Sequence, residues 1–437
     1  MSRWTTCCLD GGLPLVTLHR PGVGLVAARL WIRGGSSVEG PGMRGAMQLL
    51  AGVMTRGCAD LDAEQLADLV EGRGAALRSE AHEDALVISL KCASDDLTGL
   101  LPLLLAMARD PGLEPDQVEI ERELNLQNLQ RQQEDPFQLA HDHLRQLLYD
   151  DGPYGHDPLG VSEELTQLGA AELRPALAAL GHQGAVLVVC GDLPDPQVLR
   201  QCLNDQLART PWATGRPRAT PLAGGWGSAD LALVPQDTEQ LVLMLGSATV
   251  PLGEPDALCL RLLQAHAGVG MSSRLFVVMR EERGLAYDVG VHMPGRCGPS
   301  PFVWHMSTSA DHAGEALECL LDEWMALGSS ALSSEELGLA KAKFRGQEAM
   351  GRQTCGQVAD RQALVIGHGL ADSYVLDTLA AVERLDAQAL QAAARRRLTQ
   401  PRLSLCGPSA ALENAARVWR QRCPQPQGQP QGTSGSR

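Results

Sequence analysis

The chain has 437 residues, enough for roughly two to four domains, and its 44% hydrophobic and 20% charged residues are typical of a globular protein with its own core. Its formal net charge of −15 argues against nucleic acids and anionic membranes as partners, because both select a basic protein face. No apolar run approaches the length of a membrane span, and the first residues lack the apolar segment of a signal peptide. The 12 cysteines show no metal-ligand spacing, so we expect free thiols in a reducing cytoplasm.

Hydrophobic periodicity predicts both strands and helices in the first half of the chain. Apolar residues that alternate or run continuously indicate strands, and a helical period of apolar residues indicates helices. The predicted strands are residues 13–18, 25–33 and 85–92, and the predicted helices are residues 43–54, 63–71, 97–108 and 116–133. This mixture favours an α+β fold with helices stacked on one face of a sheet.

The two halves of the sequence resemble each other. In the first half, a helical pattern at Leu168-Gly-Ala-Ala-Glu-Leu173 precedes the strand pattern Ala185-Val-Leu-Val-Val-Cys190 and a glycine. In the second half, Leu385-Asp-Ala-Gln-Ala-Leu390 precedes Arg402-Leu-Ser-Leu-Cys406 and a glycine. The offset of about 216 residues indicates a tandem duplication of a domain of about 200 residues.

The duplication divides the chain into four parts. We predict an N-terminal domain (residues 1–210), a linker rich in proline and glycine (211–228), a C-terminal domain (229–423) and a disordered tail (424–437). The predicted fold is two tandem homologous α/β domains, each a mainly antiparallel sheet packed on helices.

Glycines frame the first predicted helix. The strand that ends at Arg33 is followed by Gly35-Ser36-Ser37-Val38-Glu39 and then by a helical segment between Gly45 and Gly57. The zinc-binding patterns H-E-x-x-H and H-x-x-E-H are both absent. Nevertheless, this opening resembles that of the insulinase/pitrilysin superfamily of zinc peptidases, which includes mitochondrial processing peptidase. The resemblance extends through most of the chain.

The resemblance implies that the zinc site of the family has degenerated in this chain. The first His, the Glu and the second His of H-x-x-E-H fall on Gln48, Ala51 and Gly52, and the family's further Glu ligand falls on Asn128. Residues at this spacing share one helix face. Because amides are poor zinc ligands and Ala and Gly are none, we expect no metal and no cofactor in this chain.

A second matching segment lies in the C-terminal half. Arg280 and Tyr287 stand in Met279-Arg-Glu-Glu-Arg-Gly-Leu-Ala-Tyr287, where we predict a helix, a turn at Gly284 and a strand. In the family, the corresponding Arg and Tyr bind the substrate carbonyl and stabilise the oxyanion, a task that suits a permanent cation and a phenol. The alternative is structural: Arg280 would pair with surface acids, and Tyr287 would be an ordinary strand aromatic.

A glycine-rich loop precedes this segment. No Gly-Lys-Ser/Thr follows it, so it does not indicate a phosphate-binding loop. Because a similar loop contacts substrate in the processing peptidases, the resemblance implies a substrate-binding role for Gly268, Gly270, Ser272 and Ser273.

Together these features favour one function over two others. The leading hypothesis is the non-zinc-binding subunit of a heterodimeric metallopeptidase, whose homologous partner carries zinc and which cleaves peptides inside a closed chamber. The alternative is an inactive structural or peptide-binding homologue without a peptidase partner. An independent metalloenzyme is the least favoured, because the sequence shows no spaced cluster of His, Cys and carboxylate residues.

Overall fold

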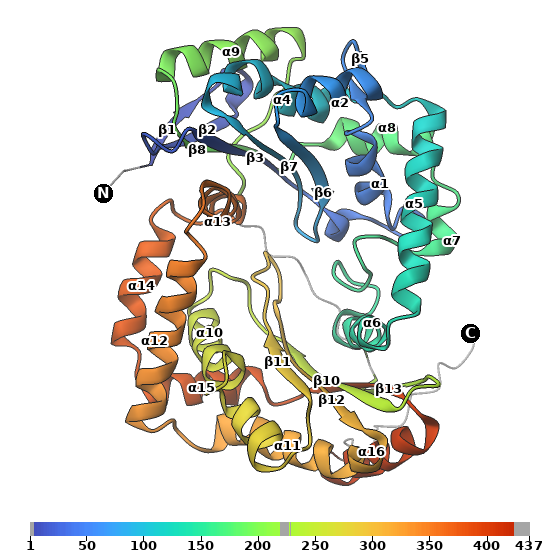
Figure 1. Cartoon of the computed structure of the whole chain (residues 1–437). Coiled ribbons are helices and arrows are strands. Elements are labelled where there is room, and N and C mark those ends of the chain that lie inside the picture. Colours follow the sequence, from blue (N-terminus) through green and yellow to red (C-terminus); the bar gives the residue numbers. More distant parts are fainter. Residues whose placement is uncertain (1–3, 219–226, 228, 424–437) are drawn as a thin grey trace, which may run out of the picture.

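The computed structural model describes residues 4–218, 227 and 229–423. The chain forms two domains, each built from one main sheet and its helices, with the N-terminal domain above the C-terminal one in Figure 1. This arrangement confirms the predicted α+β class and the two tandem domains. Within the described residues, no helix is both long and apolar enough to cross a membrane.

The N-terminal domain contains eight strands and nine α-helices in its described part. In chain order they are β1 (Thr5–Cys8), β2 (Pro14–His19), β3 (Leu25–Arg33), α1 (Ala46–Val53), β4 (Gly57–Cys58), β5 (Leu61–Asp62), α2 (Ala63–Glu71), β6 (Ala76–Ala81), β7 (Ala85–Ala93), α3 (Leu97–Leu100), α4 (Pro102–Arg109), α5 (Pro115–Gln133), α6 (Pro136–Tyr149), α7 (Ser162–Leu165), α8 (Ala170–Ala179), β8 (Ala185–Gly191) and α9 (Pro196–Arg209).

The C-terminal domain follows the same plan. Its elements are β9 (Leu231–Pro235), β10 (Gln240–Ala248), α10 (Pro255–Gly268), a π-helical segment (Phe276–Glu282), β11 (Asp288–His292), β12 (Pro301–Ser309), α11 (Ala313–Ser329), α12 (Ser334–Met350), α13 (Cys355–Gly367), α14 (Tyr374–Arg384), α15 (Ala387–Arg397), β13 (Arg402–Gly407) and α16 (Ser409–Arg422).

The two main sheets share one topology. The N-terminal sheet has the order β1-β2-β8-β3-β7-β6 and the C-terminal sheet β11-β12-β10-β13-β9. Apart from β1, each strand has a counterpart at the same place in the other sheet, and the one parallel pair, β2/β8 or β9/β13, is also conserved between them. The repeated topology agrees with the internal duplication that the sequence predicts.

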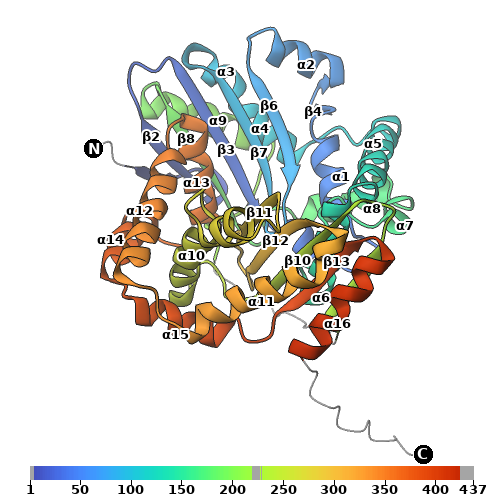
Figure 2. The same ribbon diagram turned by 60° about the horizontal axis from the view of Figure 1, so that its bottom comes forward.

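Both faces of the central strands are buried. In β3, Leu30 and Ile32 point into the core of the N-terminal domain, while Ala27 and Trp31 belong to a second cluster on the opposite face. In the C-terminal domain, α10, α11 and α16 cover the outer side of the sheet, as Figure 2 shows. Helices on the outer side therefore bury only one of the two faces of the sheet.

Each domain covers the second face of the other domain's sheet with one helix. The helix α13 packs on β3 and β8, where Ala359, Ala363 and Ile366 join the cluster around Trp31. The corresponding helix α6 packs on β10 and β13 (Figure 1). The predicted stacking of helices on one sheet face is therefore incomplete, because a helix of the other domain covers the second face.

The first part of the predicted linker lies against the N-terminal domain. Trp212 is buried in that domain's core, and its Nε1–H donates to the Leu180 carbonyl over 3.0 Å. Residues 219–226 and 228 of the linker lie outside the described residues, as does the predicted disordered tail over 424–437.

Candidate functional site

The N-terminus of α1 is capped by Glu39, the last residue of the segment Gly35-Ser36-Ser37-Val38-Glu39. Gly45 takes a left-handed φ of +107° at the N-cap and offers no side-chain cap. Instead, the Glu39 carboxylate accepts the Gly45 N–H over 2.9 Å and the Met47 N–H over 2.6 Å. His156 also lies 2.8 Å from Glu39, through its Nε2. An anion here satisfies orphan N–H groups and complements the helix dipole.

Three of the predicted zinc-ligand positions lie on α1. Gln48, Ala51 and Gly52 have the spacing that places their side chains on one side of the helix. The Gln48 side chain accepts the backbone N–H of Ala81, on the edge strand β6, over 2.9 Å. Gln48 therefore ties α1 to the sheet by a hydrogen bond.

The neighbouring helix α5 presents Glu121 to Gly52. A Cβ atom at Gly52 would lie 2.5 Å from Glu121 Oε2, so the absence of a side chain there leaves room for this carboxylate. Arg56, in the loop after the end of α1, forms an ion pair with Glu121 over 2.5 Å. The acid is thus buried with a charged partner, as a buried carboxylate requires.

The fourth predicted position, Asn128, lies two turns beyond Glu121 on α5. Between them Asn125 is only 4% exposed, and its Nδ2 has no hydrogen-bond partner among the described residues. Within those residues, no group of three potential His, Cys, Asp or Glu ligands forms at this helix pair. The one group found lies at the boundary between the domains.

Arg280 and Tyr287 contact each other across the turn at Gly284. The Arg280 guanidinium donates to the Tyr287 carbonyl over 3.1 Å and lies over the Tyr287 ring, 5.4 Å from its centroid. The Tyr287 side chain is nevertheless 78% exposed, which is unusual for a large aromatic. The arrangement fixes the guanidinium beside a solvent-facing phenol.

The helix that carries Arg280 is a π-helix rather than the α-helix expected from the sequence. Its end is joined to the segment before β11 by Met279, whose carbonyl accepts the N–H groups of Leu285 and Ala286 over 2.7 and 3.1 Å. π-Helical turns are rare and are often found at functional sites. The local geometry is therefore consistent with a role beyond packing.

The glycine-rich loop divides into a packed and an open part. At Gly268 a Cβ atom would lie 2.6 Å from the Val291 side chain on β11, so this glycine permits the close approach of α10 to the sheet. Ser273 is buried, whereas Gly270 and Ser272 are exposed. Only the open part offers contacts to a ligand.

The structure brings some of the predicted residues together and leaves others apart. Arg280 and Tyr287 form one unit of the C-terminal domain, and the four zinc-ligand positions lie on the packed helices α1 and α5 of the N-terminal domain. In the described part of the chain, no hydrogen bond links Arg280 or Tyr287 to those helices.

Sequence reasoning missed Glu121, Arg56 and His156. The i, i+4 spacing of Glu121 and Asn125 on a strongly polar helix is a local signal that points to Glu121. Arg56 and His156 have no comparable local signal, because their partners are distant in sequence.

Two family models match the sequence of this chain. Residues 15–160 match the family model described as insulinase (peptidase family M16), and residues 182–344 match the model described as peptidase M16 inactive domain. The two matches together cover well over half of the chain. The chain belongs to the insulinase (M16) peptidase family.

Similar proteins match nearly the whole length of the chain. An uncharacterized zinc protease of Streptomyces coelicolor is 25% identical over 413 residues, covering 92% of this chain and 88% of the relative. The uncharacterized zinc protease YmxG of Bacillus subtilis is 22% identical, with coverages of 90% and 95%. The term zinc protease is part of the names of these relatives and is not a statement about this chain.

Solved structures share the fold. The peptidase M16 inactive domain from Pseudomonas fluorescens superposes with a TM-score of 0.84 at 22% identity, covering 93% of this chain and 98% of that one. A protease from Helicobacter pylori gives a TM-score of 0.82 at 17% identity, with coverages of 93% and 100%. The predicted M16-type fold is therefore confirmed.

Proposed function

We propose that this chain is the non-zinc-binding subunit of a heterodimeric M16 metallopeptidase, to which it contributes substrate binding and oxyanion stabilisation. The observation that carries the proposal is the exposed Arg280–Tyr287 unit in a chain whose α1 has no zinc ligands. A structural subunit has no need to hold a guanidinium against a phenol that is open to solvent.

The chemistry of the two groups fits the role. The phenol of Tyr287 can donate one hydrogen bond to a developing oxyanion, and the guanidinium of Arg280 has several donors and a permanent charge. One Arg280 donor is used on the Tyr287 carbonyl, which orients the rest of the fork. The exposed Gly270 and Ser272 would offer further contacts to a peptide substrate.

The zinc ion belongs to the partner in this proposal. That partner is a homologous M16 chain with an intact H-x-x-E-H motif, and the two chains would enclose the chamber in which unstructured peptides are cleaved. The metal would polarise the scissile carbonyl there. The 12 free thiols of this chain suit a reducing compartment, so we assign the complex to the cytoplasm.

Reconstitution tests the proposal. The purified chain alone is expected not to cleave a fluorogenic unstructured peptide, and a zinc-bearing M16 homologue from the same organism is expected to be weakly active alone. Mixing the two should give a chelator-sensitive peptidase. Robust cleavage by this chain in the absence of the homologue would contradict the proposal.

The second candidate is a peptide-binding homologue without a peptidase partner. The match of the C-terminal half to a model described as an inactive domain favours it. Under this alternative, the chain binds the peptide alone, and addition of the homologue leaves peptide cleavage unchanged.

A further inference from the structure

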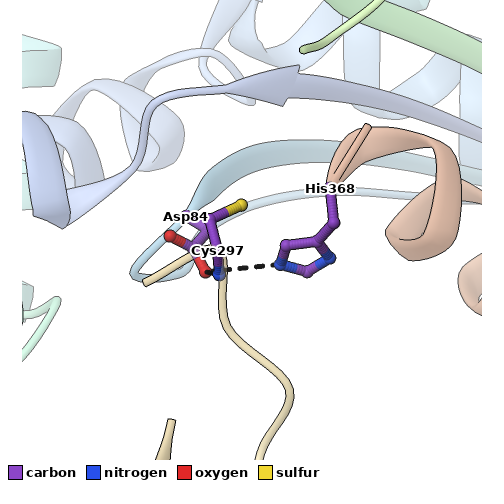
Figure 3. Close-up of side chains that lie close together, drawn as sticks. All are labelled: Asp84, Cys297 and His368. Atoms are coloured by element: carbon purple, nitrogen blue, oxygen red, sulfur yellow. Dashed lines mark hydrogen bonds and ion pairs between the residues drawn. The ribbon is translucent and has the colours of Figure 1, made fainter. Parts of the chain in front are cut away.

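Three potential metal ligands meet at the boundary between the domains. Asp84 lies in the turn between β6 and β7, Cys297 in the loop between β11 and β12, and His368 directly after α13. One carboxylate oxygen, the thiol sulfur and one imidazole nitrogen lie within 4.8 Å of one another. Figure 3 shows the three side chains. The Asp84 and His368 side chains are only 10% and 5% exposed.

The distance between two of these atoms suits a shared metal ion. His368 Nε2 lies 3.3 Å from Asp84 Oδ2. Charge-assisted hydrogen bonds are usually about 2.7–2.9 Å long. By contrast, an oxygen and a nitrogen that bind one tetrahedral zinc ion at about 2.0 Å each are about 3.3 Å apart.

The hydrogen bonds around the cluster fix the orientation of the imidazole. His368 Nδ1 lies 2.8 Å from the Leu364 carbonyl, which can only accept, so the Nδ1 atom carries a proton. The other ring nitrogen, Nε2, therefore faces the Asp84 carboxylate. Metal-binding histidines are typically oriented by this kind of second hydrogen bond.

Hydrogen bonds also orient the Asp84 carboxylate. Its Oδ1 accepts the Tyr154 hydroxyl over 2.7 Å, and its Oδ2 accepts the Cys297 N–H over 2.8 Å. An ionised carboxylate oxygen has a second lone pair, so Oδ2 retains one for a metal. The neighbouring acid Glu83 is already paired with Arg296.

We propose that Asp84, Cys297 and His368 form a binding site for a zinc-like divalent ion that clamps the two domains together. Carboxylate, thiolate and imidazole are typical ligands of such a borderline cation, and three protein ligands leave the fourth position to water. Binding forms a metal–sulfur bond, and the thiol proton passes to solvent. The ligands are too far apart in sequence to form a spaced motif. The proposed ion is structural and separate from the degenerate catalytic zinc position on α1, where the proposal still places no metal.

Cobalt(II) titration of the isolated, metal-free, full-length chain tests the proposal, because cobalt bound to a thiolate has a near-ultraviolet charge-transfer band. We expect one equivalent to bind with that band. Cys297→Ser should abolish the band, and both Cys297→Ser and His368→Gln should weaken binding at least tenfold. Cys7→Ser, at another half-buried cysteine, and Gln48→Ala, at the degenerate zinc position, should leave the band and the affinity unchanged.

Two results would overturn the site: no cobalt binding by the folded chain, or a band that survives Cys297→Ser. If Cys297→Ser does not fold, alkylation of the unmutated chain decides instead. Zinc should then slow modification of Cys297 at least tenfold and leave Cys7 unaffected, and equal modification with and without zinc rejects the site. Neither assay measures peptidase activity, so the outcome is independent of the proposed function.

Discussion

The hydroxyl of Tyr287 separates a catalytic role from a structural one. Because the side chain is 78% exposed, Tyr287→Phe should leave the melting temperature unchanged. If the phenol stabilises an oxyanion, the same change should lower the turnover of the reconstituted complex by about 10²–10³. Turnover and thermal unfolding of the same preparation check this prediction.

Tyr374 provides the matched control. Its hydroxyl donates to the Leu252 carbonyl over 2.8 Å, far from the Arg280 turn in sequence. Tyr374→Phe should therefore lower stability by about 1 kcal/mol and leave turnover per folded molecule intact. Unchanged turnover in Tyr287→Phe would remove the main reason to regard this chain as part of a catalytic complex.

A glycine at position 52 lowers the helix propensity of α1, and the close approach of Glu121 explains why no larger residue stands there. Replacing a helical glycine by alanine usually stabilises by about 1 kcal/mol. Here the new Cβ would meet Glu121 Oε2 at 2.5 Å and disturb its ion pair with Arg56, so we expect Gly52→Ala to bring no gain.

A double-mutant cycle tests this coupling. In a chain that already carries Glu121→Ala, the carboxylate is gone and Gly52→Ala should recover the stabilisation of about 1 kcal/mol. Urea unfolding of the four chains measures the coupling energy. Additive effects of the two substitutions would show that Glu121 does not restrict this position.

At the same scale, the sequence predicts positions better than partners. The helix that carries Gln48, Ala51 and Gly52 was predictable, because the glycines that flank it are a local sequence motif. The pairing of Glu121 with Arg56 joins residues 65 positions apart, and no local pattern encodes it. The cluster of Asp84, Cys297 and His368 escapes sequence analysis for the same reason.

At the scale of helices, the ion pairs of Asp256 join α10 to α15. Asp256, in the first turn of α10, accepts hydrogen bonds from Arg396 and Arg397, and these bonds, led by the one from Arg396, lower its pKa despite partial burial. A carboxylate with a lowered folded-state pKa stabilises the fold above its unfolded pKa, about 3.9, and this stabilisation is lost as pH falls through the folded pKa.

Asp256→Asn should therefore lower the free energy of unfolding at pH 7 by about 1 kcal/mol, and the difference from the unmutated chain should shrink below about pH 4. Asp116 follows a proline in the first turn of α5 in the same way and is exposed, so Asp116→Asn controls for the helix dipole. Chemical unfolding across pH measures both. A pH-independent deficit in Asp256→Asn would refute the ion-pair account.

Element boundaries follow local chemistry where local chemistry is strong. The helix α2 has the predicted bounds because Asp62 and Gln65 form a reciprocal capping box over 2.9 and 3.0 Å. The predicted helix over 97–108 divides at Pro102, which begins α4. The π-helix at Arg280 was not predictable, since its hydrogen-bond register has no sequence period of its own.

For the whole molecule, the exchanged helices predict cooperative unfolding. If either domain unfolds, it removes the helix that covers one sheet face of the other. Differential scanning calorimetry of the intact chain should therefore show one transition. Two well-separated transitions would mean that the domains are stable without each other.

Gly367 lets this prediction be tested by substitution. A Cβ atom there would lie 2.4 Å from the Trp31 ring, so Gly367→Ala should push α13 from β3 and cost roughly 1–3 kcal/mol while preserving a single transition. Gly338 on α12 has open space around its Cβ position, and Gly338→Ala should not destabilise. A second transition in Gly367→Ala alone would contradict shared unfolding.

The reciprocal covering of the sheets also makes either half incomplete by itself. A gene for one half alone would encode a polypeptide with a bare apolar sheet face, unless a sister copy covered that face with its own helix. A separate half would therefore be complete only as a homodimer with exchanged helices, in which each copy covers the sheet of the other. In a single chain the two halves need not have identical sequences, so each half can lose or keep its own chemistry.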